Sequence, residues 1–253
     1  MSDDLLVEHA RRLWAGLAGA PVEFGADGLE VVVSSSSRLC PPGWVGIVRV
    51  SEGVIATAPD ERSADVVRRG LGGLGAAALT DVDVVRGRLP VEDVLGPATL
   101  AYCDADGFRA GADECRAAAD GVRAGADDGV ERVAVGELGS LIGRVSDDER
   151  GEAGLEDIDS AAFVLRSAGE IVAASGYEVW PTGTAHLSVL TDPRHRGRGL
   201  ARSVASAAVR DALRAGLVPQ WRARPEPSRR LARALGFREL GAQLSIRLHT
   251  TPS

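Results

Sequence analysis

Two glycines and three arginines gather in one short segment, residues 193–200, which reads PRHRGRGL. Glycine has no side chain, so backbone N–H groups around Gly197 and Gly199 can converge on an anion. A helix that begins directly after this loop adds its unpaired N–H donors and the positive end of its dipole. Arg194, Arg196 and Arg198 supply positive charge that suits phosphate oxygens. The segment therefore predicts a pyrophosphate-binding site.

The spacing of the glycines excludes two common phosphate loops. A dinucleotide fingerprint needs G-x-G-x-x-G, and a Walker loop needs Gly-Lys-Ser/Thr. All 29 basic residues are arginine, and the sequence contains neither lysine nor asparagine. A P-loop lysine and a Schiff-base lysine are therefore both excluded.

The charge of the chain is distributed unevenly. Residues 1–185 carry 16 arginines against 32 acidic residues, whereas residues 186–253 carry 13 arginines against 4. The basic end indicates an anionic partner, and both nucleic acid and a phosphorylated cofactor fit that description. Three cysteines at unrelated spacings, without a Cys/His grouping, support neither a disulfide framework nor a metal site, so we expect no metal.

The hydrophobic periodicity places the loop between a strand and a helix. We expect a helix over 138–145, strands over 161–166, 170–180 and 184–190, a helix over 199–215, a strand over 218–223, a short helix over 227–235, and strands over 237–240 and 244–248. This order predicts a mixed α/β (α+β) sheet that contains a parallel β-α-β crossover.

The rest of the chain predicts a second domain. Residues 104–129 are rich in Ala, Gly and Asp and indicate an interdomain connection, helical around 113–124, which divides the chain into domains 1–128 and 129–253. In the first domain we expect a helix over 5–17, strands over 29–33, 45–50 and 53–57, a helix over 60–79 and a strand over 98–102. The similar order of elements, and Thr57-Ala58-Pro59 beside Thr191-Asp192-Pro193, favour a degenerate copy of one fold about as much as coincidence.

The loop and its flanks resemble a known family. Arg194–Ala201, RHRGRGLA, is similar to the R/Q-x-x-G-x-G/A signature of GCN5-related N-acetyltransferases (GNATs), and it has the upstream strand with Asp-Pro, the downstream helix and a second landmark, ALGF at 234–237. The resemblance covers about 90 residues. It implies the GNAT acyl-CoA N-acyltransferase fold in the C-terminal half, with acetyl-CoA (coenzyme A) as the acyl-donor substrate.

The resemblance also implies where acetyl-CoA lies. The strand over 218–223 splays from the strand over 184–190, and the thioester lies in the gap. Backbone groups at Val189, Leu190 and Thr191 meet the pantetheine arm, and the loop with the helix start holds the pyrophosphate. The implied cofactor-binding residues are Val189, Leu190, Thr191, Arg194, Arg196, Gly197, Arg198, Gly199, Leu200, Ala201 and Ser228.

The chain departs from the family after the fourth strand. Many members read Asn-x-x-Ser-x-x-x-Tyr-x-x-x-Gly-Phe, and this chain keeps Ser228 but has Pro225 for the asparagine and Ala232 for the tyrosine. That tyrosine is the usual acid for the leaving thiolate. A thiol has a pKa of about 8.5, so thiolate can leave without it. The departure keeps a second hypothesis open, a catalytically weak or inactive acyl-CoA-binding regulatory or scaffold protein.

Transfer to an amine needs a base, because an amine with a pKa near 10 is mostly protonated at neutral pH. His186 is the first candidate. Its strand resembles that of arylalkylamine N-acetyltransferases, where histidines at two alternate positions relay the proton, and here Ser188 occupies the second position. Glu178, near the end of the neighbouring strand, is the second candidate. A packed strand histidine and a solvated carboxylate remain the alternatives.

The most favoured function is transfer of the acetyl group of acetyl-CoA to an amine by direct attack. We expect a small-molecule or peptide amine as the acceptor, no nucleic acid and no membrane, and we leave a homodimer open. The start of the chain, MSDDLLVEHARRLW, lacks the layout of a signal peptide, so a cytoplasmic location is expected. Nucleic-acid binding is the least favoured hypothesis, because RGG-like segments lack flanking strand and helix patterns.

Overall fold

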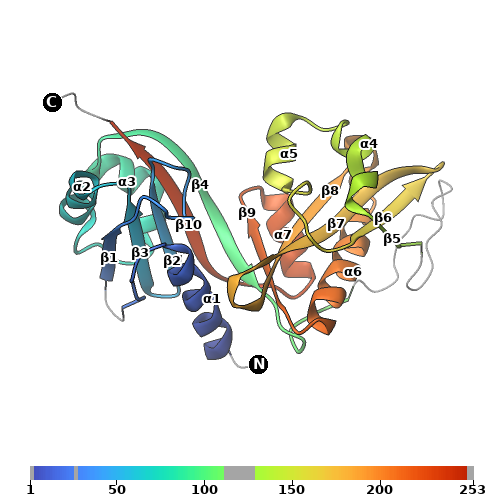
Figure 1. The fold of residues 1–253 in the computed structure, drawn as a ribbon, viewed down its shortest axis with the longest axis horizontal. Coiled ribbons are helices and arrows are strands. Elements are labelled where there is room, and N and C mark those ends of the chain that lie inside the picture. The colour runs from blue at the N-terminus through green and yellow to red at the C-terminus, as the bar shows by residue number, and fades with distance from the viewer. Residues whose placement is uncertain (1–2, 26–27, 111–128, 250–253) are drawn as a thin grey trace. The chain divides into compact units, whose positions relative to one another are not determined.

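The computed structural model describes residues 3–25, 28–110 and 129–249. The chain forms two compact units, of which unit 1 comprises residues 1–101 with 239–253, and unit 2 comprises residues 102–238. Both are mixed α/β structures (Figure 1). Within the described ranges, no helix is both long and apolar enough to cross a membrane. Most of the predicted connection over 104–129, including its expected helix, lies outside the described residues.

Unit 1 is a five-stranded sheet with helices packed on it. Its strands lie in the order β1-β3-β2-β10-β4, with β1 parallel to β3, and β2 antiparallel to both β3 and β10. Its elements are α1 (Asp3–Leu17), β1 (Gly28–Val33), β2 (Val45–Val50), β3 (Gly53–Ala58), α2 (Glu61–Leu71), α3 (Val82–Arg88), β4 (Val91–Tyr102) and β10 (Arg238–Leu248).

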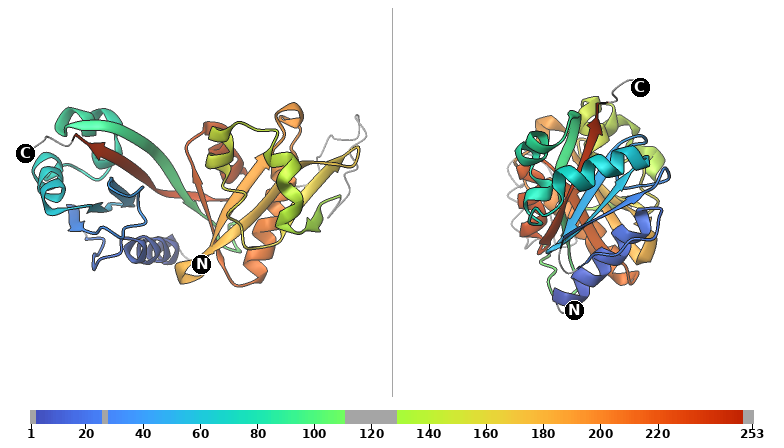
Figure 2. Two further views of the ribbon diagram at one scale, coloured as in Figure 1. Left: turned by 45° about the horizontal axis from the view of Figure 1, so that its top comes forward. Right: turned by 90° about the vertical axis from the view of Figure 1, so that its left-hand side faces the viewer.

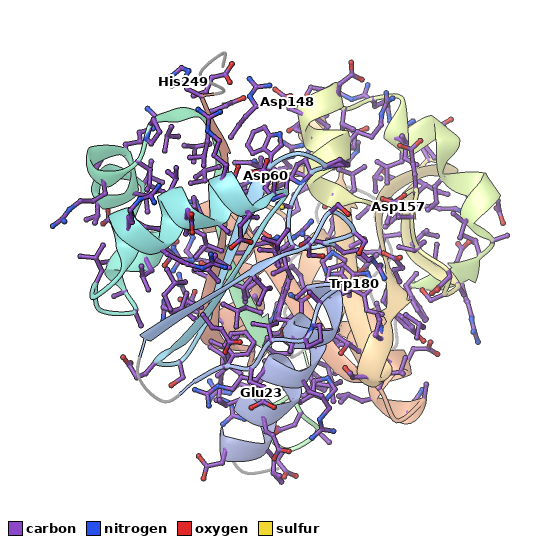
Figure 3. The ribbon with its side chains drawn as sticks, turned by 60° about the vertical axis from the view of Figure 1, so that its left-hand side comes forward. Glu23, Asp60, Asp148, Asp157, Trp180 and His249 are labelled. Atoms are coloured by element: carbon purple, nitrogen blue, oxygen red, sulfur yellow. The ribbon has the colours of Figure 1, made fainter. Side chains whose placement is uncertain are left out.

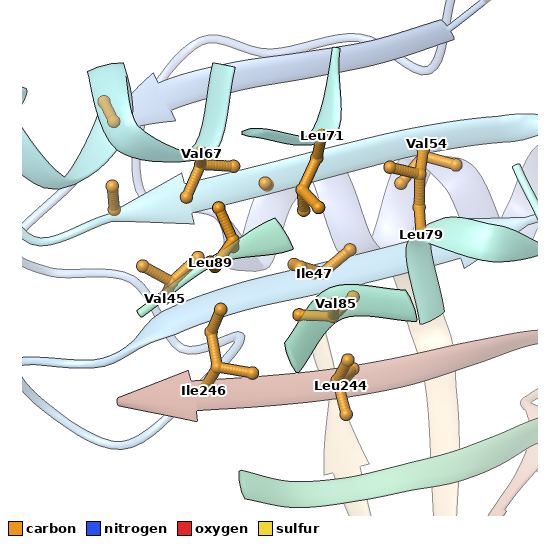
Figure 4. Close-up of a cluster of buried hydrophobic side chains, with 13 residues drawn as sticks. Val45, Ile47, Val54, Val67, Leu71, Leu79, Val85, Leu89, Leu244 and Ile246 are labelled. Atoms are coloured by element: carbon orange, nitrogen blue, oxygen red, sulfur yellow. The ribbon is translucent and has the colours of Figure 1, made fainter. Parts of the chain in front are cut away.

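Alternate residues of these strands build the core of unit 1. Val45 and Ile47 of β2 and Leu244 of β10 are buried against Val67 of α2 and Val85 of α3 (Figure 4). The predicted helix over 60–79 is too long, because α2 ends at Leu71 and Gly73 follows in the left-handed region with φ 79°. The predicted order α-β-β-β-α-β is present except that a further helix, α3, lies between α2 and β4. The duplication stays a prediction.

Unit 2 carries the segment that resembles the acetyltransferases. Its strands lie in the order β9-β8-β7-β6-β5, antiparallel from β5 to β8 and parallel between β8 and β9. This confirms the predicted parallel crossover. Its main elements are β5 (Glu131–Val133), α4 (Gly139–Ile142), α5 (Asp147–Ala153), β6 (Ala162–Ser167), β7 (Glu170–Trp180), β8 (Thr184–Thr191), α6 (Leu200–Arg214), β9 (Val218–Ala223) and α7 (Glu226–Ala234).

Helices cover both faces of the sheet of unit 2. Figures 1 and 2 show α6 on one side of the strands and α4 with α5 on the other. Successive residues of β8 serve the two sides, because Leu190 packs in the core cluster under α4 and Val189 packs against the cluster that includes Leu200 and Val204 of α6. The face under α4 and α5 also carries His186, which lies two residues from Ser188 and four from Leu190 along β8.

Two predictions at the ends of unit 2 need correction. The helix expected over 138–145 is shorter than predicted, because α4 covers only Gly139–Ile142, and α5, which was not predicted, follows it with the capping box of Ser146 and Glu149. The two strands expected around Gly241 are the single strand β10, most of which belongs to unit 1 because it pairs with β2. A Cβ at Gly241 would lie 1.9 Å from the carbonyl oxygen of Arg49, so this glycine allows close backbone approach and does not end the strand.

Candidate acetyl-CoA cleft

The parallel pairing of β8 with β9 is short. It joins Thr184 to Val218, Ala185 to Pro219 and His186 to Gln220, while β8 runs on to Thr191 and β9 runs on to Ala223. The paired register therefore ends at His186 and Gln220, and the rest of the two strands borders a gap. This is the splaying that the resemblance implies and that the sequence cannot display.

A cleft of about 700 Å³ follows this gap within unit 2. Its walls come from β8, the loop after it, the start of α6, β9, α7 and α5. Most of the residues predicted to bind acetyl-CoA line this one cleft: Val189, Leu190, Thr191, Arg196, Gly197, Gly199, Leu200, Ala201 and Ser228. The volume lies within the range of ~300–1,000 Å³ that is usual for small-molecule sites.

The start of α6 is open toward the cleft. Gly197 and Gly199 have φ of 76° and 80°, which is the left-handed conformation that glycine adopts without strain. A Cβ at either position would meet no atom of the described residues within 4 Å, so they leave the backbone there uncovered. Gly199 caps α6 without a side-chain hydrogen bond, and the first turn of the helix presents N–H groups that have no partner inside the helix. An anion can therefore approach these groups closely.

A buried carboxylate holds the loop in place. Asp192, with 1% of its side chain exposed, pairs with Arg144 Nε at 2.8 Å and accepts from Arg194 Nη2 at 3.0 Å. The hydrogen bonds from Arg194 are the main cause that keeps the pKa of Asp192 far below its usual range. Arg194 is thus bound to Asp192, and neither Arg194 nor Arg198 is among the residues that line the cleft. Their predicted contact with the pyrophosphate remains a prediction.

Acidic side chains of α5, which the sequence analysis did not select, also line the cleft. Glu149 Oε1 lies 2.7 Å from Arg196 Nη2, and Glu152 Oε2 accepts from Arg224 Nε at 2.7 Å. The two arginines belong to opposite walls, one after β8 and one after β9. The capping box of Ser146 and Glu149 is a sequence signal for the start of α5. The position of α5 over the gap depends on tertiary packing and has no such signal. These acids reduce the attraction of the cleft for an anion.

We predict that Glu149→Gln strengthens the binding of acetyl-CoA by up to about fivefold. Glutamine keeps the size and the capping function of Glu149, but it releases Arg196 from an exposed ion pair worth ~0.2–1 kcal/mol. Calorimetric titration with acetyl-CoA measures this change. Asp147→Asn is the control, because it removes the same charge from α5 at a residue that does not line the cleft. Weaker binding by Glu149→Gln, or equal gains in both variants, would contradict the prediction.

The two candidate bases lie opposite one another on β7 and β8. Trp180, which Figure 3 labels, lies two residues after Glu178 on β7. His186 Nδ1 is hydrogen-bonded to Oε1 of Gln220. The imidazole stacks on the indole of Trp180, with 4.1 Å between the ring centroids and 18° between the planes, and Trp180 Nε1 donates to Glu178 Oε2 at 2.7 Å. We call the point at which β9 leaves β8, at the pair His186 and Gln220, the vertex of the cleft. Neither His186 nor Glu178 lines the cleft itself, but both lie beside this vertex.

His186 is neutral over the whole physiological range of pH. Burial, and after it the guanidinium of Arg222, lower the pKa of His186 to about 3, against a smaller opposing effect of Gln220. A base with this pKa cannot hold a proton at neutral pH, but it can accept a hydrogen bond and pass the proton on. Ser188, at the second relay position, is buried and donates to the carbonyl oxygen of Gly154 at 3.0 Å.

Within the described residues, no tyrosine lines the cleft. Ala232, at the position of the usual tyrosine, is buried, with 2% of its surface exposed. The hydroxyl of Ser228 lines the cleft and accepts from Trp221 Nε1 at 3.0 Å, which leaves its own proton able to donate. Tyr177 OH lies on the other face of the sheet and donates to Asp211 Oδ2 at 2.8 Å, and burial raises the pKa of Tyr177 to about 12.

A family model described as GNAT acetyltransferase matches residues 161–242, which span β6 to the first part of β10 and include β8 and β9 on either side of the cleft. This segment belongs to the GNAT superfamily. Residues 161–242 accordingly have the GNAT fold. No curated protein matches the chain.

Several solved structures are similar to the chain. A GCN5-related N-acetyltransferase from Kribbella flavida is 15% identical, covering 65% of this chain and 62% of its own, with a TM-score of 0.45. A GCN5-related N-acetyltransferase-like protein from Streptococcus suis is 16% identical, covering 81% and 84%, with a TM-score of 0.39. A protein from Salmonella typhimurium, solved with its cofactor acetyl-CoA, is 18% identical, covering 49% and 96%, with a TM-score of 0.33.

Proposed function

We propose that unit 2 transfers the acetyl group of acetyl-CoA to an amine. The observation that carries the proposal is the cleft between β8 and β9, which has an open helix N-terminus along one wall and His186 beside its vertex. The pyrophosphate of acetyl-CoA fits the helix start, because backbone N–H groups and the helix dipole favour anions there. The pantetheine arm then follows Thr191, Leu190 and Val189 toward the vertex.

The reaction proceeds by direct attack, without a covalent intermediate on the protein. The amine nitrogen attacks the thioester carbonyl carbon, the C–N bond forms, and the C–S bond breaks with release of the coenzyme A thiolate. The nitrogen loses one proton through its hydrogen bond to His186, and this proton ends on the departing thiolate or on water. The thiolate leaves without a tyrosine, since its conjugate acid has a pKa of only about 8.5, and Ser228 is the hydroxyl donor of the cleft.

A second function also has support in the chain. Pro225 and Ala232 replace the family's asparagine and tyrosine, and acidic residues of α5 pair with two cleft arginines. Both features suit a domain that binds acyl-CoA as a regulatory or scaffold module with little or no turnover. This alternative predicts cofactor binding without catalysis.

Release of free thiol from acetyl-CoA separates the two functions. It is measured with a panel of amines that includes polyamines, arylalkylamines, amino acids and peptide N-termini. Amine-dependent release together with an acetylated product supports the transferase. Binding of acetyl-CoA by calorimetry without release for any amine supports the binding module. No binding of acetyl-CoA would contradict both.

A further inference from the structure

The side chain of Gln220 lies at the point where β9 leaves β8. Gln220 and His186 are the last pair of the parallel register, so their side chains meet across the vertex of the cleft. Gln220 is fully buried, with 0% of its surface exposed. A buried amide at this place is costly unless its polar atoms are used.

One end of the Gln220 amide is bound and the other is not. Its Oε1 lies within hydrogen-bond distance of His186 Nδ1, whereas its Nε2 has no hydrogen-bond partner in the part of the chain that the structure describes. A glutamine that served only to stabilise the fold would be expected to have both ends bonded, since leaving a buried donor unsatisfied is unfavourable. The arrangement therefore favours a role for Gln220 through His186.

An amide oxygen can only accept a hydrogen bond, so the nitrogen that faces it must carry the proton. With Nδ1 protonated, the neutral imidazole has its lone pair on Nε2. Stacking on Trp180 fixes the plane of the same ring. Gln220 and Trp180 together hold both the tautomer and the orientation of His186.

We propose that Gln220 is the positioning residue of this site, which holds His186 in the tautomer whose Nε2 accepts the proton of the acceptor amine. The inference rests on the proposed acetyl transfer for its kinetic part only. Gln220 itself touches neither substrate in this scheme. It acts on the reaction by keeping the lone pair of His186 on the nitrogen that is not bound to β9.

The tautomer can be observed without any acceptor. Nitrogen-15 NMR of the imidazole side chains in the full chain, with His186→Ala used to assign the signal, distinguishes the protonated ring nitrogen from the one with a lone pair. We expect His186 to be neutral with Nδ1 protonated, and Gln220→Leu to shift the population toward the other tautomer. A wild-type His186 with its proton on Nε2, as a reversed amide of Gln220 would produce, overturns the proposal.

The kinetic test uses Gln220→Leu, Gln220→Glu and an amine that the thiol-release panel identifies. Gln220→Leu should lower kcat/KM about tenfold or more through kcat, as expected for the loss of one orienting hydrogen bond. Gln220→Glu keeps an acceptor for Nδ1–H and should restore most of that loss. The affinity for acetyl-CoA, measured by calorimetry, should be equal in the wild type and both variants.

Gln220→Glu should also change the pH dependence. The charged groups around the imidazole are Arg222 on β9 and Glu178 on β7, with Glu152 of α5 acting on Arg222. A carboxylate at position 220 favours the imidazolium, so the pKa of His186 should rise and an inflection should enter the accessible pH range. If His186 takes no part in the transfer, the rate should show no such inflection.

The other glutamine of the chain is the matched control. Gln243 on β10 is also buried and its Nε2 is bonded to the carbonyl oxygen of Leu39, so Gln243→Leu should lower the melting temperature and leave kcat unchanged. Gln220→Leu should lower kcat and leave the melting temperature unchanged. Equal kcat in Gln220→Leu and the wild type, or a loss that Gln220→Glu does not restore in a folded protein, overturns the inference. If no amine is acetylated, the tautomer measurement still decides whether Gln220 positions His186.

Discussion

Gly199→Val should abolish the rise in melting temperature that acetyl-CoA gives the wild-type protein. A ligand that binds only the native state stabilises it by RT ln(1 + [L]/Kd), which is about 2.7 kcal/mol at a ligand concentration of 100 Kd. At Gly199 the backbone is uncovered and stands at the start of α6, so the valine side chain would occupy the approach of the pyrophosphate. Thermal unfolding with and without saturating acetyl-CoA measures the effect.

Gly216→Val controls for the strain that valine brings. Gly216 follows the other end of α6, has φ 74°, and would likewise meet no atom within 4 Å of a new Cβ. A β-branched residue is unfavourable in this left-handed region by ~1–3 kcal/mol, so both variants should melt at a lower temperature than the wild type. Only Gly199→Val should lose the response to acetyl-CoA. A full response in folded Gly199→Val would contradict the assignment of the phosphate loop.

The parts of the site that could be predicted are those determined by residues close together in the sequence. Glycines at 197 and 199, the strand before them and the helix after them lie within about 30 residues, so the loop and its open helix start could be predicted. The strands β7 and β9 have the predicted bounds, because glycine and proline residues lie close to both of their ends. Local chemistry determines these elements almost alone.

The features that were not predictable depend on distant pairing. The vertex of the cleft lies where the pairing of β8 with β9 ends, and no single residue in either strand indicates this position in the sequence. Glu149 and Glu152 have an ordinary helical spacing, and only packing brings them to Arg196 and Arg224. The proposed role of Gln220 likewise depends on its hydrogen bond to His186, which lies 34 residues away in the sequence.

The fold of the first half shows the same limit. Its strands were placed within a few residues, apart from β4, which begins seven residues before the predicted start at Ala98. Their neighbours could not be inferred, since β1 pairs in parallel with β3, and β10 arrives from the far end of the chain to pair with β2. The period of a strand reports which face is buried and gives no information about which strand lies beside it.

His186→Ala should lower kcat by ~10²–10⁴, the usual range for the loss of general base catalysis. The affinity for acetyl-CoA should barely change, because the cleft is lined further along by backbone and loop residues. Because burial and Arg222 lower the pKa of His186 to about 3, its charge is constant from pH 5 to 9 and the wild-type rate should have no inflection near 6.5. The deficit of His186→Ala should shrink as the pH rises, because more of the amine is then already deprotonated.

Glu178→Gln decides between the two candidate bases. The replacement keeps a carbonyl oxygen for Trp180 Nε1, which donates to Glu178 at 2.7 Å, and removes only the charge and basicity of the carboxylate. If Glu178→Gln produces the expected profile and His186→Ala does not, the two roles must be exchanged. If both variants turn over like the wild type, solvent takes the proton, and the cleft accelerates transfer by holding a free amine against the thioester. We expect the larger loss at His186, because it stands at the vertex of the gap, whereas the carboxylate of Glu178 is engaged by Trp180.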